Sequence, residues 1–195
     1  MTKGLVYIHG KGGSAQEAEH YKPLFPDYDV IGFDYKAETP WQATAEFRSF
    51  YDDFKRKHEE VIIVANSIGA YFTMVSLCDS QIEKAYFISP IVDMEGLILN
   101  MMKWAGVTEK QLREKGIIGE LSWEYLSWVR NNPVYWSVKT EILYGENDNL
   151  QSIETIGDFS GRINADVTVM KNGEHWFHTP QQMAFLDNWI TDRQE

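Results

Sequence analysis

Ser67, Asp148 and His175 are residues whose types and order along the chain could together perform acyl transfer. A serine hydroxyl is a weak nucleophile unless a base accepts its proton, and a histidine base needs a third group that fixes its tautomer. In this sequence the serine comes first, the carboxylate second and the histidine third. Each follows a short hydrophobic run, so we expect all three at the ends of buried strands.

The surroundings of Ser67 predict a sharp turn between a strand and a helix. The pentapeptide ANSIG (65–69) joins the apolar run VIIVANS (61–67) to the helical segment IGAYFTMVSLC (68–78). Small residues two positions before and two positions after the serine suit a crowded, strained turn. Such a turn lifts the hydroxyl above the sheet and directs the first N–H groups of the helix to the same place.

The acid and the base each have a rival nearby. Asp148 lies in the loop YGENDNL (144–150), where Glu146 is a second carboxylate, but Glu146 lies closer to the strand with less loop to reach a histidine. His175 lies in KNGEHWFHTP (171–180), where His178 abuts the start of the last helix. We therefore prefer Asp148 and His175, although a turn aspartate and a surface histidine are the ordinary roles of such residues.

A glycine-rich loop, HGKGGS (9–14), follows the first strand. Its glycines at 10, 12 and 13 allow the backbone to approach a ligand closely. A phosphate-binding loop is the competing interpretation, but neither G-x-x-x-x-G-K-[ST] nor G-x-G-x-x-G occurs here.

These motifs resemble those of the α/β-hydrolase family. The pentapeptide is similar to its nucleophile elbow, G-x-S-x-G, with Ala65 in place of the first glycine, and the order serine, acid, histidine is the family's order. The resemblance implies an oxyanion hole formed by the backbone N–H groups of Lys11 and Ile68, and a structural role for His9. Because LVYIHG (5–10) comes so early in the sequence, we expect the two antiparallel strands with which the family usually begins to be absent.

The elements needed to position these residues are predicted by hydrophobic patterning. Near-continuous apolar runs indicate strands covered on both faces; they lie at 4–10, 28–35, 61–67, 84–90, 140–146 and 165–171. Helices alternate with them, and Thr39 and Thr179 each precede a Pro and a Gln in a capping-box arrangement. We therefore predict an α/β, three-layer sandwich with a mainly parallel sheet of about six strands and helices on both faces.

Residues 91–137 break the alternation and predict a small helical cap of two or three short helices, without strands. Its apolar underside could line a substrate pocket, or the segment could be an ordinary helical layer with a buried face. As pocket residues we expect four from the cap and one from the histidine loop: Met101, Trp104, Trp123, Trp128 and Trp176.

Composition limits the remaining possibilities. A length of 195 residues and 44% hydrophobic content fit one globular domain spanning 1–195. The net charge of -11 argues against nucleic acid and against an anionic membrane surface as partners. One cysteine, no signal peptide and no apolar stretch of membrane-spanning length lead us to expect a cytoplasmic protein; its oligomeric state stays open.

The expected function is a serine hydrolase that needs no cofactor and no metal, since no group of residues has the spacing of metal ligands. The resemblance implies a small carboxylic ester as the substrate, with a thioester as the next choice. A ligand-binding protein with slow or no turnover, and a hydrolase of amide or carbon–carbon bonds, remain the alternatives.

Overall fold

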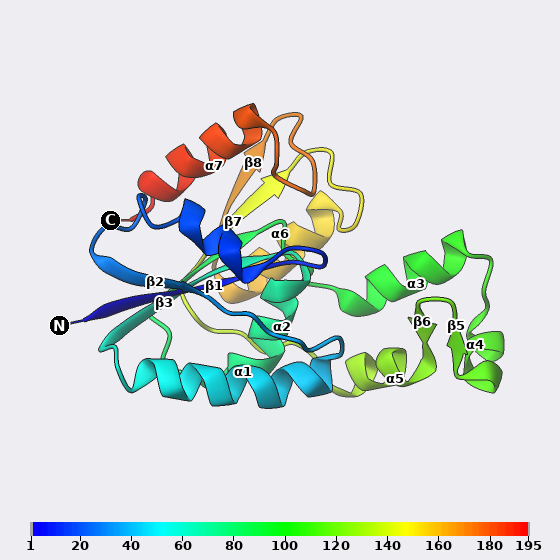
Figure 1. The fold of residues 1–195 in the computed structure, drawn as a ribbon. Coiled ribbons are helices and arrows are strands. Elements are labelled where there is room, and N and C mark those ends of the chain that lie inside the picture. The colour runs from blue at the N-terminus through cyan, green and yellow to red at the C-terminus, as the bar shows by residue number, and fades with distance from the viewer. Residues whose placement is uncertain (1, 195) are drawn as a thin grey trace.

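The centre of the protein is a six-stranded parallel sheet (Figure 1). The computed structural model describes residues 2–194. The strands follow in chain order: β1 (Lys3–Ile8), β2 (Tyr28–Gly32), β3 (Glu60–Asn66), β4 (Lys84–Ile88), β7 (Thr140–Gly145) and β8 (Asp166–Met170). Their spatial order is β2-β1-β3-β4-β7-β8, and every neighbouring pair is parallel. All six predicted strands are present, each within a few residues of the expected range.

The order of the strands places a crevice at one edge of the sheet. After β1 the chain moves outward to β2, and it then returns to the other side of β1 to form β3, with Leu5 paired to both Val30 and Ile62. In open parallel sheets, a crevice forms where the loops after two adjacent strands run in opposite directions. It lies beyond the carboxyl ends of these strands, and ligands bind there. The glycine-rich loop after β1 and Ser67 after β3 meet at this point.

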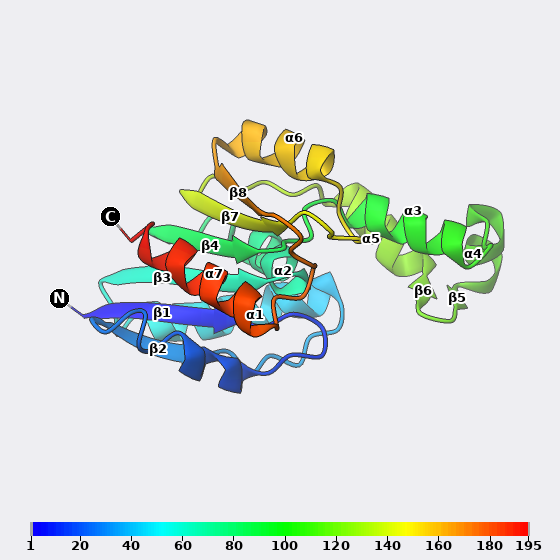
Figure 2. The same cartoon turned by 90° about the horizontal axis from the view of Figure 1, so that it is seen from above.

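Helices cover both faces of the sheet (Figures 1 and 2). One face packs against α1 (Pro40–Lys55), α2 (Ile68–Leu77) and α6 (Ile153–Ile163), and the other against the 3-10 helix η1 (Ala15–His20) and α7 (Pro180–Thr191). Alternate residues of β3 divide between the two layers. Val61, Ile63 and Ala65 join the first hydrophobic cluster, whereas Ile62 and Val64 join the second. The three-layer prediction is therefore confirmed.

Two of the helix starts were predicted from their caps. Thr39 and Thr179 are the N-caps of α1 and α7, and their side chains accept hydrogen bonds from the backbone N–H groups of Gln42 and Gln182. Each glutamine side chain reaches back to the N–H of its threonine, at 3.2 Å in both helices. These reciprocal bonds satisfy donors that the first turn of a helix cannot satisfy itself.

The segment between β4 and β7 projects beyond the carboxyl edge of the sheet (Figure 1). It contains α3 (Met94–Trp104), α4 (Glu109–Lys115), β5 (Ile117–Ile118), β6 (Leu121–Ser122) and α5 (Trp123–Asn131). The expectation of no strand here was wrong, because β5 and β6 form an antiparallel hairpin. Two-residue strands are too short to give a periodic pattern, and Gly119 supplies the positive φ of 59° that the turn needs.

The projecting segment shares one hydrophobic core with the α1 side of the sheet. Leu97, Met102, Leu112 and Leu126 belong to the same buried cluster as the residues beneath α1 and α2. Trp128 of α5 lies 6.4 Å, ring centre to ring centre, from Trp41 in the first turn of α1. The segment is thus anchored on one side of the sheet edge. Of the helices described in residues 2–194, none combines the length and the apolar character that a bilayer crossing requires.

Two glycines allow a matched test of backbone packing. A Cβ on Gly32, at the end of β2, would lie 1.9 Å from the Ala15 carbonyl oxygen, whereas a Cβ on Gly157 in α6 would meet nothing within 4 Å. We expect Gly32→Ala to lower the free energy of unfolding by about 1–3 kcal/mol, because η1 must move. Gly157→Ala should raise it by about 0.5–1 kcal/mol, because alanine favours the helix. Urea denaturation curves test both, and equal effects of the two changes would contradict the packing of η1 on β2.

Candidate active site

Ser67 lies at a strained turn between β3 and α2. It is the N-cap of α2, with φ 51° and ψ -121°, a conformation that costs on the order of 1–3 kcal/mol for a residue other than glycine. Two backbone hydrogen bonds hold this geometry: the Ser67 N–H donates to the Ile88 carbonyl at 3.0 Å, and the Ile91 N–H donates to the Ser67 carbonyl at 3.2 Å. The end of β4 therefore fixes the turn.

Small residues surround the turn because the backbone is crowded there. A Cβ on Gly69 would lie 2.4 Å from the His9 carbonyl oxygen, and a Cβ on Gly10 would lie 3.1 Å from the Ser67 Cβ. Ala65 replaces the first glycine of the G-x-S-x-G pattern, and its methyl group is fully buried in the cluster beneath α1 and α2. The departure from the pattern is accommodated because this methyl packs in the core.

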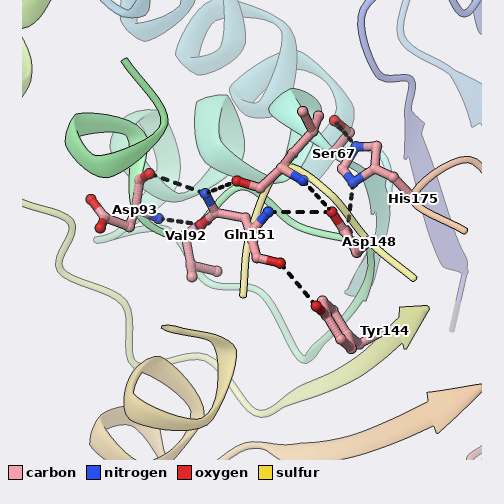
Figure 3. A network of polar contacts seen from close by, with 8 residues as sticks. Ser67, Val92, Asp93, Tyr144, Asp148, Gln151 and His175 are labelled. Carbon is pink, nitrogen blue, oxygen red and sulfur yellow. Dashed lines mark hydrogen bonds and ion pairs between the residues drawn. The ribbon is translucent and has the colours of Figure 1, made fainter. Parts of the chain in front are cut away.

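The three residues singled out in the sequence form a continuous hydrogen-bonded chain (Figure 3). Ser67 Oγ lies 2.8 Å from His175 Nε2, and His175 Nδ1 lies 2.6 Å from Asp148 Oδ2. The Asp148 side chain is fully buried, and the His175 side chain is 16% exposed. Because an ionised carboxylate only accepts, Nδ1 carries the proton and Nε2 is free to accept from the serine hydroxyl.

The rival residues have other partners. His178 stacks on the Trp176 ring at 4.3 Å, and its Nδ1 lies 2.7 Å from the Trp176 carbonyl oxygen. Glu146 accepts a hydrogen bond from the Asn172 N–H at 2.8 Å, and thereby holds the turn after β8. His9 stacks on Tyr35 at 4.3 Å and its ring nitrogen lies 2.8 Å from the Gly10 carbonyl. Each of these side chains therefore supports a loop.

Close backbone contact brings the acid loop and the histidine loop together. A Cβ on Gly145 would lie 2.5 Å from the Glu174 carbonyl oxygen, so only glycine allows the two loops to approach. The Asn147 N–H also donates to the Gly173 carbonyl at 2.7 Å. The glycines before Asp148 and His175 thus set the separation of the two side chains.

Gln151 connects Asp148 to the base of the projecting segment (Figure 3). Its backbone N–H donates to Asp148 Oδ1 at 3.2 Å, beside the Leu150 N–H at 2.8 Å. Its buried side chain accepts from the N–H groups of Val92 and Asp93 at 3.1 and 2.8 Å, and donates to the Asp93 carbonyl at 3.2 Å. Gln151 therefore provides hydrogen-bond partners both in the loop of Asp148 and at the start of the projecting segment.

The glycine-rich loop lies next to Ser67. Its turn is closed by the Gly13 N–H, which donates to the Gly10 carbonyl at 3.1 Å, and Gly12 has a φ of 79°. Within residues 2–194, the backbone N–H groups of Lys11 and Ile68 donate to no acceptor. These are the two groups expected to form an oxyanion hole, and both flank Ser67.

A pocket of about 520 Å³ opens beside Ser67 and His175, between η1 and α7. Its apolar wall is formed by Ile88, Phe177, Met183 and Leu186, and its polar wall by Tyr7, Glu17, His20, Tyr21 and Asn66. Of the five residues expected to line a substrate pocket, Trp176 does so at the mouth, where it is 71% exposed. The remaining four belong to the projecting segment and are not part of this lining: Met101, Trp104, Trp123 and Trp128.

Those four residues do not line the pocket because the projecting segment and the pocket lie on different sides of the sheet. The projecting segment packs with α1, whereas the pocket opens on the side of η1 and α7. Trp104 is 64% exposed and Trp123 packs against the Arg113 guanidinium. The polar wall was not predicted from the sequence, although Ser14 and Glu17 have the spacing of a capping box and Asn66 directly precedes the serine.

Comparison with solved structures shows the α/β-hydrolase fold over the whole chain. A protein from Agrobacterium vitis S4 named as a candidate hydrolase matches with a TM-score of 0.78 at 16% identity, covering 100% of this chain and 88% of that one. Est1E from Butyrivibrio proteoclasticus matches with a TM-score of 0.74 at 12% identity (98% and 86% covered). The Pyrococcus furiosus esterase Pf2001 matches with a TM-score of 0.61 at 19% identity (97% and 79% covered). No family model matches the sequence, and no curated protein does.

Replacing Gln151 tests how the acid loop is held. Gln151→Leu has a similar volume but removes the acceptor of two N–H groups, the buried one of Val92 and the partly buried one of Asp93. We expect the free energy of unfolding to fall by about 2–4 kcal/mol, because each unsatisfied group costs about 1–3 kcal/mol. Urea denaturation measures this, with Gln81→Leu on the surface as the control. A loss below about 0.5 kcal/mol would mean that the two loops do not depend on this side chain.

Proposed function

We propose that this protein is a serine hydrolase that cleaves a small carboxylic ester, or a thioester, through an acyl-enzyme on Ser67. The observation that carries the proposal is the hydrogen-bonded chain from Ser67 Oγ through His175 to the buried Asp148, at 2.8 and 2.6 Å. It stands beside a pocket large enough for a small substrate and beside two free backbone N–H groups. The α/β-hydrolase fold and its esterase neighbours support the same reaction class.

The first half of the reaction forms the acyl-enzyme. Ser67 Oγ attacks the acyl carbon while its proton moves to His175 Nε2, and the carbonyl oxygen becomes an oxyanion. The N–H groups of Lys11 and Ile68 donate to this oxyanion, and the loss of one such donor costs about 3–4 kcal/mol in similar sites. Collapse breaks the bond to the leaving alcohol or thiol, which takes the proton from His175.

The second half releases the acid. A water molecule attacks the acyl-enzyme while His175 Nε2 accepts one of its protons, and the same N–H groups stabilise the second oxyanion. His175 then returns the proton to Ser67 Oγ as the carboxylic acid leaves. Asp148 stabilises the imidazolium through its bond to Nδ1, and its carboxylate is held in place because it accepts three hydrogen bonds within the protein.

Substitutions at the proposed triad test the reaction directly. Ser67→Ala should abolish hydrolysis of p-nitrophenyl butyrate and labelling by a fluorophosphonate, and His175→Ala should lower kcat/KM by several orders of magnitude. His178→Ala is the matched control and should lose less than about tenfold, because its ring contacts Trp176 and not Ser67. Wild-type protein that neither labels nor hydrolyses esters would favour a ligand-binding role on the same fold.

Two exposed tryptophans provide a matched test of the substrate pocket. Trp176→Ala should change the relative kcat/KM for acetyl, butyryl and octanoyl esters by roughly 10- to 200-fold, the range of apolar pocket contacts. Trp104→Ala removes an equally exposed ring from the projecting segment and should leave this rank order unchanged. If Trp104→Ala changed the rank order and Trp176→Ala did not, the acyl group would bind under the projecting segment, which is one of the two possibilities expected from the sequence.

A further inference from the structure

The pocket beside Ser67 has a wall of oxygen atoms that neither step of the proposed reaction uses. Glu17 of η1 lines the pocket, where its Oε2 accepts a hydrogen bond from the Tyr7 hydroxyl. Its Oε1 accepts from the Ser14 N–H at 3.0 Å. These two bonds fix the direction of the carboxylate in the pocket wall.

The hydroxyl of Tyr21 and the side-chain amide of Asn66 belong to the same wall of the pocket as Glu17. Tyr21 is only 3% exposed yet lines the pocket, and its hydroxyl lies within hydrogen-bonding reach of the Asn66 side chain. Asn66 donates to the Tyr7 hydroxyl at 2.9 Å, while its own Oδ1 is buried and has no partner in residues 2–194. Burial, followed by the nearby carboxylates of Glu17 and Asp187, raises the pKa of Tyr21. A buried group that is left unpaired in the free protein is a group that a ligand can satisfy.

The balance of charge in the pocket is negative. Lys11 at the mouth is bound to Glu120 of the β5–β6 turn at 3.1 Å, and His20 is bound to Asp187 at 2.7 Å. Glu17 forms no ion pair with a Lys, Arg or His side chain anywhere in the described part of the chain. The ring of Tyr21 stacks on that of Tyr7 at 4.9 Å and adds an electron-rich aromatic surface.

We propose that this wall is a cation subsite: Glu17, with the oxygens of Tyr21 and Asn66, selects substrates that bear an ammonium group on the part of the ester entering the pocket. The apolar wall of Ile88, Phe177 and Met183 then contacts the carbon chain that joins the ammonium group to the ester. The inference rests on the proposed hydrolase function for the reaction, but cation binding itself requires no catalysis. It makes Glu17 a specificity-determining residue.

Matched esters test the subsite. We would measure kcat/KM for choline acetate against its neutral analogue, in which a tert-butyl group replaces trimethylammonium. We would also compare the p-nitrophenyl ester of trimethylammonio-butyric acid with its tert-butyl isostere, so that the charge enters with the alcohol in one pair and with the acyl group in the other. In one of the pairs, wild-type protein should prefer the cationic ester by about tenfold or more, a difference of about 1.4 kcal/mol.

Glu17→Gln removes the charge and keeps the shape of the side chain. The preference for the cationic ester should fall to about twofold or less in this variant, and the ratio cancels any general loss of activity from a displaced glycine-rich loop. Glu19→Gln is the control, because Glu19 lies on the same 3-10 helix and pairs with Lys22 outside the pocket lining. It removes the same net charge and should leave the ratio unchanged.

Three results would overturn the subsite. The first is a wild-type ratio of kcat/KM, cationic over neutral ester, that is near one in both pairs. The second is an unchanged ratio in Glu17→Gln. The third is an equal fall of the ratio in Glu19→Gln, which would mean that the preference depends only on the overall charge of the protein. If Glu17→Gln fails to fold, wild-type protein provides the test: its ratio should fall as NaCl rises from about 20 mM to about 500 mM, because salt screens an accessible ion pair. A ratio independent of salt would contradict the proposal.

A binding measurement separates this inference from the proposed function. Calorimetry with hexyltrimethylammonium on the Ser67→Ala variant needs no turnover, and its neutral tert-butyl analogue provides the comparison. Selective binding of the cation without ester cleavage by wild-type protein would overturn the hydrolase function and retain the subsite. Ester cleavage with no selectivity for the cation, in binding or in turnover, would retain the hydrolase and overturn the subsite.

Discussion

The backbone conformation of Ser67 is the constraint on which the rest of the site depends. A φ of 51° at a residue with a side chain is unfavourable, and it persists only where neighbouring segments hold it. Here the end of β4 binds the Ser67 N–H, and the residue after Pro90 binds its carbonyl. The glycine-rich loop fits against the turn because residues 10 and 69 have no Cβ. The strain is thus distributed over three strands that are adjacent in the sheet.

Much of this arrangement could be predicted from local sequence. Apolar runs revealed all six long strands, and the threonine, proline and glutamine patterns revealed the starts of α1 and α7. The approximate positions of Ser67, Asp148 and His175 followed from parallel topology, because the carboxyl ends of parallel strands share one edge of the sheet. The position of a motif that lies within ten residues of a strand end could therefore be predicted from the sequence.

What the sequence did not reveal depends on contacts between distant segments. The side on which the projecting segment packs is decided by contacts such as that between Trp41 and Trp128, which no periodicity encodes. The hydrogen bonds of Gln151 to Val92 and Asp93 join residues almost sixty positions apart. The polar wall of the pocket likewise combines β1, η1 and β3. Such pairings can be predicted only when the order of the strands in the sheet is known.

The sequence separation within the site has a consequence for the order in which the protein becomes functional during synthesis. His175 follows Ser67 by 108 residues, and part of the apolar wall of the pocket comes from α7, the last helix described. Domains fold as their segments leave the ribosome, N-terminal parts first. A nascent chain can thus form the strained turn and the glycine-rich loop while His175 is still inside the ribosome. The contact between Ser67 and His175, and the part of the pocket wall that α7 supplies, can form only after these later segments have emerged, so that a product ending before residue 175 lacks both.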